Sequence, residues 1–109
     1  MKIKKFLLIL SISFLLNTQI SFADEAKMTK GLEIFNEVAG CAACHVLKAA
    51  GSEGNIGPNL DTVEGLNYDS VMDIVTHGLG VMPAFGEDEI LTKEEIDIVS
   101  FYVSNSVSK

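Results

Sequence analysis

The sequence predicts an all-α domain with three main helices and two long loops. Three segments, near residues 28–38, 69–77 and 92–105, carry apolar side chains at the spacing of a helix. The stretches between them are rich in glycine, and no segment alternates apolar and polar residues over the length of a strand. With 109 residues, the chain is long enough for one small domain.

The first helix is expected from about Met28 to Val38. Leu32, Phe35 and Val38 recur at helical spacing and should form its buried stripe. Gly40 follows directly, and glycine readily adopts the left-handed backbone that ends many helices. The helix should therefore stop just before the first cysteine.

The second helix is expected to begin near Asp69, with Asp69 or Ser70 as its cap, and to end at Gly78. Its apolar stripe consists of Val71, Ile74 and Val75. The third helix should open with a capping box formed by Thr92 and Glu95 and fade near Asn105. Its buried face should carry Ile96, Val99 and Val103, with Tyr102 beside them.

The two loops differ in composition. Residues 49–60 contain three glycines, a proline, a serine and two asparagines, which is typical of a loop with unusual backbone angles. Residues 78–86 are mostly apolar. An apolar loop is expected to press against another apolar surface rather than to extend into water.

The most informative stretch is the pentapeptide from Cys41 through Cys44 to His45. Two thiols three positions apart, followed by an imidazole, form the attachment signature of a c-type haem. Each thiol adds to one vinyl group of the porphyrin, and the adjacent histidine can donate a ring nitrogen to the iron. Two alternatives remain open: a redox-active disulfide, and a zinc site, for which only His77 is available as a further imidazole ligand.

The second axial ligand decides what a haem protein can do. Met82 is the best candidate, because it lies in the apolar loop and Pro83 stiffens the backbone after it. Its thioether is a soft ligand that favours ferrous iron. Met72, on the second helix, is expected to fill the core, and Met28 precedes the pentapeptide too closely. His77 is the remaining alternative, although a histidine at a helix end more often interacts with the last carbonyls.

Residues 1–23 have the layout of a cleaved secretory signal peptide. A basic start is followed by an apolar run over residues 6–16 and by small residues at positions 21 and 23. The alternative is a retained anchor, but the run is shorter than the ~20 residues that span a bilayer. The expected mature domain is 24–109, located in the periplasm without stable membrane insertion.

The expected mature domain is strongly acidic. Three of the eight lysines precede residue 24, so five lysines and all fifteen acids remain, giving a net charge of about −10. Such a surface repels nucleic acid and favours redox partners with a basic docking patch. Solubility alone is the alternative explanation for the charge.

The chain resembles the class I cytochromes c, in particular the small bacterial monohaem carriers. The resemblance covers nearly the whole expected mature domain. Its matching segments are the helix with Gly31 and Phe35, residues 41–45, residues 57–60, residues 80–85 and the terminal helix with Tyr102. The resemblance implies a small cytochrome c-like fold with three main helices and long loops wrapped around one covalent haem c.

The resemblance also implies the roles of individual residues. Cys41 and Cys44 would hold the porphyrin, while His45 and Met82 would ligate the iron from opposite faces. Pro58 matches the proline whose carbonyl accepts a hydrogen bond from the other ring nitrogen of the histidine. Gly31 and Tyr102 match the positions where the first and last helices cross closely. Lysines that surround the haem edge in mitochondrial-type carriers are nearly absent here, so the same partner surface is not implied.

The expected function is one-electron transfer between redox proteins by a monomeric carrier that is not an enzyme. A six-coordinate haem has no vacant position for a substrate, and no acid–base pair or nucleophile stands near the pentapeptide. Two other functions remain possible from the sequence. One is a dedicated cytochrome subunit of a periplasmic dehydrogenase or oxidase complex, and the other is a ligand-binding or sensor haem from which Met82 dissociates.

Overall fold

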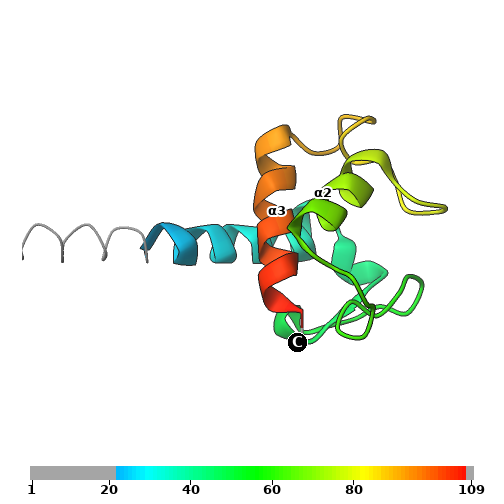
Figure 1. Cartoon of the computed structure of the whole chain (residues 1–109), viewed down its shortest axis with the longest axis horizontal. Helices are drawn as coiled ribbons and strands as arrows, with labels where there is room; N and C mark the ends of the chain where they lie inside the picture. Colours follow the sequence, from blue (N-terminus) through cyan, green and yellow to red (C-terminus); the bar gives the residue numbers. More distant parts are fainter. Residues whose placement is uncertain (1–21, 108–109) are drawn as a thin grey trace, which may run out of the picture.

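The computed structural model describes residues 22–107 and confirms the all-α class. After a helix over residues 22–33, the elements are η1 (Ile34–Val38), η2 (Cys41–Ala43), β1 (Val46–Leu47), η3 (Lys48–Ala50), β2 (Ser52–Glu53), α2 (Tyr68–His77) and α3 (Lys93–Ser106). Helices α2 and α3 pack on each other, and the first helix crosses α3 (Figure 1). Within residues 22–107, no helix has the length and apolar character to cross a membrane. Residues 1–21 of the expected signal peptide lie outside the described residues.

The first helix changes geometry partway along its length. It is already helical at residue 22, earlier than the expected start near Met28, and it continues beyond residue 33 as the wider π-helix η1. The amide of Ala39 closes this turn by donating to the Ile34 carbonyl at 2.9 Å. A π turn takes up more residues than an α turn, so side chains after it leave the original stripe. Val38, expected to be buried, is therefore 46% exposed.

Gly31 is the point of closest approach between the first helix and α3. A Cβ atom built on it would lie 2.2 Å from the Cβ atom of Tyr102 and 3.2 Å from the Ile98 carbonyl oxygen. One helical turn later, the Phe35 ring lies 6.0 Å from the Tyr102 ring. The structure thus confirms the close crossing of Gly31 and Tyr102 that the resemblance implied.

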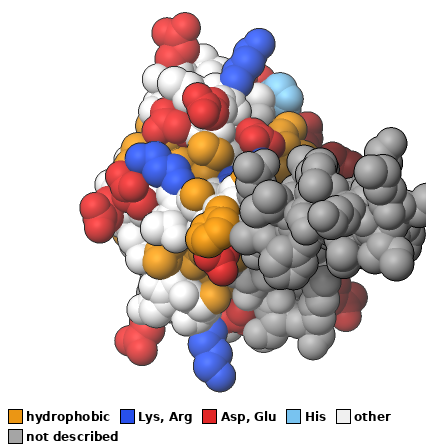
Figure 2. Space-filling view, turned by 90° about the vertical axis from the view of Figure 1, so that its left-hand side faces the viewer, with side chains coloured by type: hydrophobic (Ala, Val, Ile, Leu, Met, Phe, Trp, Pro, Cys, Tyr) orange, Lys and Arg blue, Asp and Glu red, His pale blue; other side chains and the backbone are white. Residues whose placement is uncertain are grey.

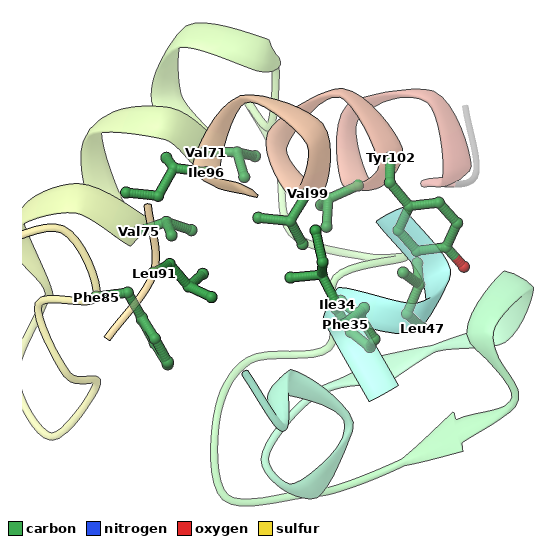
Figure 3. Close-up of a cluster of buried hydrophobic side chains, with 11 residues drawn as sticks. Ile34, Phe35, Leu47, Val71, Val75, Phe85, Leu91, Ile96, Val99 and Tyr102 are labelled. Carbon is green, nitrogen blue, oxygen red and sulfur yellow. The ribbon is translucent and has the colours of Figure 1, made fainter. Parts of the chain in front are cut away.

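The hydrophobic core joins the crossing helices to α2 and to the loop before α3 (Figure 3). Its buried members are Ile34, Phe35, Leu47, Val71, Val75, Phe85, Leu91, Ile96, Val99, Tyr102 and Val103. The expected faces of α2 and α3 are confirmed, except that Ile74 is only half-buried.

The helix caps confirm one prediction and correct another. Thr92 and Glu95 form the expected capping box at the start of α3. In α2 the cap is Asn67, rather than Asp69 or Ser70. The Asn67 side chain accepts from the Ser70 amide at 3.0 Å, and the Ser70 hydroxyl accepts from the Asn67 amide at 3.0 Å. A serine can replace the usual glutamate in this reciprocal arrangement, so the helix begins earlier than the sequence suggested.

A short hairpin that the sequence did not predict follows the pentapeptide. Strands β1 and β2 are antiparallel, with Val46 opposite Glu53 and Leu47 opposite Ser52. Two residues per strand are too few to produce a visible alternation of apolar and polar side chains. Gly51, with φ of +67°, makes the turn possible. The hairpin brings the glycine-rich loop back toward the pentapeptide.

Candidate haem site

The pentapeptide folds as a tight turn that places both cysteines on one side. Gly40 adopts the expected left-handed backbone (φ +69°), and the 3₁₀-helix η2 begins immediately after it. The amides of Cys44 and His45 both donate to the Cys41 carbonyl, at 3.1 and 3.0 Å. Side chains three positions apart are nearly eclipsed in a 3₁₀ turn. Two thiols can therefore face one planar group while His45 follows directly.

The His45 ring is held by the backbone of the second loop. Its Nδ1 atom lies 2.7 Å from the Pro58 carbonyl oxygen. A carbonyl can only accept a hydrogen bond, so Nδ1 carries the proton and donates it. In the neutral imidazole this leaves the lone pair on Nε2, the nitrogen that is then available to a metal. The contact that the resemblance implied between His45 and Pro58 is present.

Gly57 has a part in this arrangement that the sequence reasoning missed. A Cβ atom at this position would lie 2.6 Å from Cε1 of His45, so any side chain would displace the imidazole. The Gly57 amide also donates to the Cys44 carbonyl at 2.8 Å. Gly54 approaches the same turn, with a built Cβ 2.7 Å from the Ala42 carbonyl oxygen. The only signal in the sequence was the position of Gly57 directly before Pro58.

Met82 lies on a separate loop, between α2 and α3. Its amide donates to the Leu79 carbonyl at 3.0 Å, and the Leu79 amide donates to the Met82 carbonyl at 3.2 Å, which closes a tight turn. Gly78, with φ of +76°, packs so closely that a Cβ atom would lie 2.7 Å from the Met82 carbonyl oxygen. This turn extends away from the helices, in yellow in Figure 1. The Met82 side chain is half-buried against the core.

The expected apolar loop is only partly covered. Phe85 is buried, as an apolar loop pressing on the core requires. Leu79 and Val81, however, are 69% and 91% exposed, which contradicts the expectation for these two residues. Their position in the tight turn explains the difference, because side chains at the tip of a turn point away from the core.

The other candidate axial ligands are engaged elsewhere. Met72 lines a cavity of about 430 Å³ together with Leu91 and Ile96, and none of the residues around it belongs to the pentapeptide or to residues 57–58. Both ring nitrogens of His77 face carboxylates: Nδ1 lies 2.5 Å from Glu87 and Nε2 lies 3.7 Å from Asp73. Met82 therefore stays the axial ligand that the sequence predicts.

The alternatives for the cysteines find little support. Cys41 and Cys44 are not joined to each other. Burial raises the pKa of the Cys41 thiol to about 11, whereas a redox-active pair depends on a stabilised thiolate. In the part of the chain that the structure describes, no three or more His, Cys, Asp or Glu side chains form a group that could hold a metal ion. The chemistry of a thiol pair beside an oriented imidazole fits covalent haem.

The helical fold, the paired cysteines in one turn and the carbonyl-bound imidazole define a small monohaem c-type cytochrome of the class I kind. Its cofactor is one covalently attached haem c, and its activity is electron transfer. The model of the family described as cytochrome c oxidase, cbb3-type, subunit III matches residues 26–103, and the chain belongs to this family.

A solved structure supports the same class. The chain is similar to the c-type cytochrome SorU from Sinorhizobium meliloti, with 45% sequence identity and a TM-score of 0.69. The match covers 78% of this chain and 95% of SorU. A comparison with curated proteins gave no match. The similarity therefore covers the whole domain rather than the pentapeptide alone, and it confirms the small cytochrome c fold.

Proposed function

We propose that the chain is a periplasmic one-electron carrier whose haem iron is ligated by His45 and Met82. The observation that carries the proposal is the 2.7 Å contact between His45 Nδ1 and the Pro58 carbonyl. It fixes the ring orientation, leaves Nε2 as the donor atom and makes the imidazole more electron-donating. Met82 would supply the opposite ligand from its closed turn.

Each residue of the site has a distinct task in this proposal. Cys41 and Cys44 hold the porphyrin through two thioether bonds, and Pro58 orients the His45 ring. Bound haem supplies an iron centre that gains or loses one electron. A histidine–methionine pair raises the reduction potential relative to other ligand sets. With both axial positions filled by protein, oxidation and reduction need no change of ligand, so the protein reorganises little.

The surface supports transient encounter with a basic redox protein. Figure 2 shows acidic side chains at several separate places on one face of the molecule, with apolar side chains nearer its centre. Leu79 and Val81 are large exposed apolar residues within the Met82 turn. We propose that a donor or acceptor docks at these two residues. Carboxylates elsewhere on the surface would steer its basic patch during the approach.

A second candidate function has one observation in its favour. The description of the family names a subunit of an oxidase, so the chain could serve as a dedicated cytochrome subunit rather than as a monomeric shuttle. Gel filtration of a native extract at high salt separates the two. Elution as a small protein supports the free carrier, and elution with a large enzyme supports the subunit.

A redox titration of the purified holoprotein tests the carrier function. We expect one reversible one-electron wave with unchanged ligation in both oxidation states. Because the net charge is strongly negative, oxidation by a cationic ruthenium complex should slow as salt is added, and oxidation by an anionic iron cyanide complex should accelerate. A ligand change on reduction, or the same salt response with both reagents, would contradict the proposal.

A further inference from the structure

The loop that carries Met82 is fastened at its base by backbone hydrogen bonds. The last carbonyls of a helix have no partner within it. In α2 the returning loop supplies amide donors to these carbonyls. The Phe85 amide donates to the Val75 carbonyl at 2.9 Å, and the Glu87 amide donates to the Thr76 carbonyl at 3.1 Å. The chain therefore leaves α2 at Gly78, turns at Met82 and comes back to the same end of α2.

One side-chain contact closes this loop. His77 is the last residue of α2, and its Nδ1 atom lies 2.5 Å from Oε1 of Glu87, the residue at which the loop has returned. A carboxylate only accepts, so the imidazole donates. The pair joins the two ends of a segment whose middle holds Met82. Both side chains are more than half exposed, so the contact exchanges with water and is screened by salt.

The contact is sensitive to pH. The charged groups that the structure places against the imidazole are Glu87 from the loop and Asp73 from α2 itself. The hydrogen bond to Glu87 is the main cause that raises the pKa of His77 above its ordinary value of 6.5. A raised pKa means that the contact stabilises the folded loop fully below that ordinary value. The charge-assisted part is lost as pH rises through the raised value.

We propose that His77 and Glu87 form a positioning pair that holds the Met82 loop closed while the imidazole is charged and the carboxylate is ionised, and that releases part of this hold as rising pH removes the charge of His77. The inference rests on the proposed ligation of iron by Met82. Neither residue touches the iron in this account. They act through the loop, by limiting how far the Met82 turn can move away from the rest of the domain.

The test measures the denaturant concentration at which the ferric holoprotein loses its methionine-dependent far-red absorption band. In the wild type, this midpoint should fall as pH rises from about 6 to about 9, the range over which a perturbed histidine loses its charge. His77→Gln and Glu87→Gln should each abolish that pH dependence, because neither variant retains a charged pair between α2 and the returning loop; the contact of His77 with Asp73 lies within α2. The midpoint for loss of helical circular dichroism provides the reference for global unfolding.

Glu89→Gln is the matched control. It removes the same charge from the same loop, and within residues 22–107 the Glu89 side chain forms no ion pair. It should keep the wild-type pH dependence. A denaturant midpoint that does not change with pH in the wild type would overturn the inference. So would a pH dependence that Glu89→Gln reduces as much as Glu87→Gln does.

Amide exchange separates this inference from the ligand assignment. The amides of Leu79 and Met82 close the turn, so their protection reports loop closure without reference to iron. At about pH 6, Glu87→Gln should lower their protection and Glu89→Gln should not. If the wild type lacks the far-red band but shows this difference, the Met82 ligation is wrong and the pair stands. If the band is present and the difference is absent, the pair is wrong.

Discussion

Replacing Met82 with alanine should abolish the far-red charge-transfer band of the ferric protein and lower its reduction potential. The thioether is the only soft ligand that the loop between α2 and α3 offers, and it stabilises ferrous iron relative to ferric iron. Axial ligands set haem potentials over a range of ~0.8 V, so the reduction potential should fall by a substantial part of that range. Absorption spectroscopy and a redox titration measure both effects.

Met72→Ala is the control for this substitution. Met72 lines the cavity with Leu91 and Ile96 and packs against the core, so its loss should reduce stability while leaving the band in place. If the band survives in Met82→Ala and disappears in Met72→Ala, the ligand has been assigned to the wrong methionine.

Gly31→Ala should destabilise the protein even though alanine is the better helix former. Helix propensity alone predicts a gain of about 1 kcal/mol for this change in a helix interior. The new Cβ, however, would lie 2.2 Å from Cβ of Tyr102 and 3.2 Å from the Ile98 carbonyl oxygen, both of which belong to α3. The two helices would have to separate, and overpacking of this kind costs about 1–3 kcal/mol.

The free energy of unfolding in guanidinium measures the effect of Gly31→Ala. Thr29→Ala serves as the control, because residue 29 is exposed in the same helix and alanine there improves propensity without a clash. The control should be neutral or slightly stabilising. A Gly31→Ala variant as stable as the wild type would show that the helices do not cross as closely as described.

Much of the fold followed from the sequence because its signals are local. The Thr92 and Glu95 capping box and the apolar faces of α2 and α3 depend on residues within one or two turns of each other. The π turn at residues 34–38 left no such signal, so the exposure of Val38 was missed. Asn67 was missed because a serine, rather than an acid or amide of longer reach, completes its capping box.

The residues of the site likewise fall into those with a local sequence signal and those whose contacts depend on the folded loops. Cys41, Cys44 and His45 lie within five consecutive residues, and their spacing alone indicates covalent haem. The contact from His45 to Pro58 spans 13 residues and was expected only through the resemblance to a known family. The fit of Gly57 against the imidazole and the pairing of His77 with Glu87 depend on how the loops fold back, which local patterns do not report.

Carbon monoxide binding to the reduced wild-type protein tests the central claim, that protein ligands close both axial positions of the haem. At neutral pH we expect no carbon monoxide complex in the wild type, because Met82 would occupy the sixth position under the proposed ligation. Met82→Ala should bind the gas readily, and that variant shows that the haem remains accessible to it. Rapid formation of the carbon monoxide complex by the wild type would contradict a closed electron carrier and would favour a ligand-binding haem.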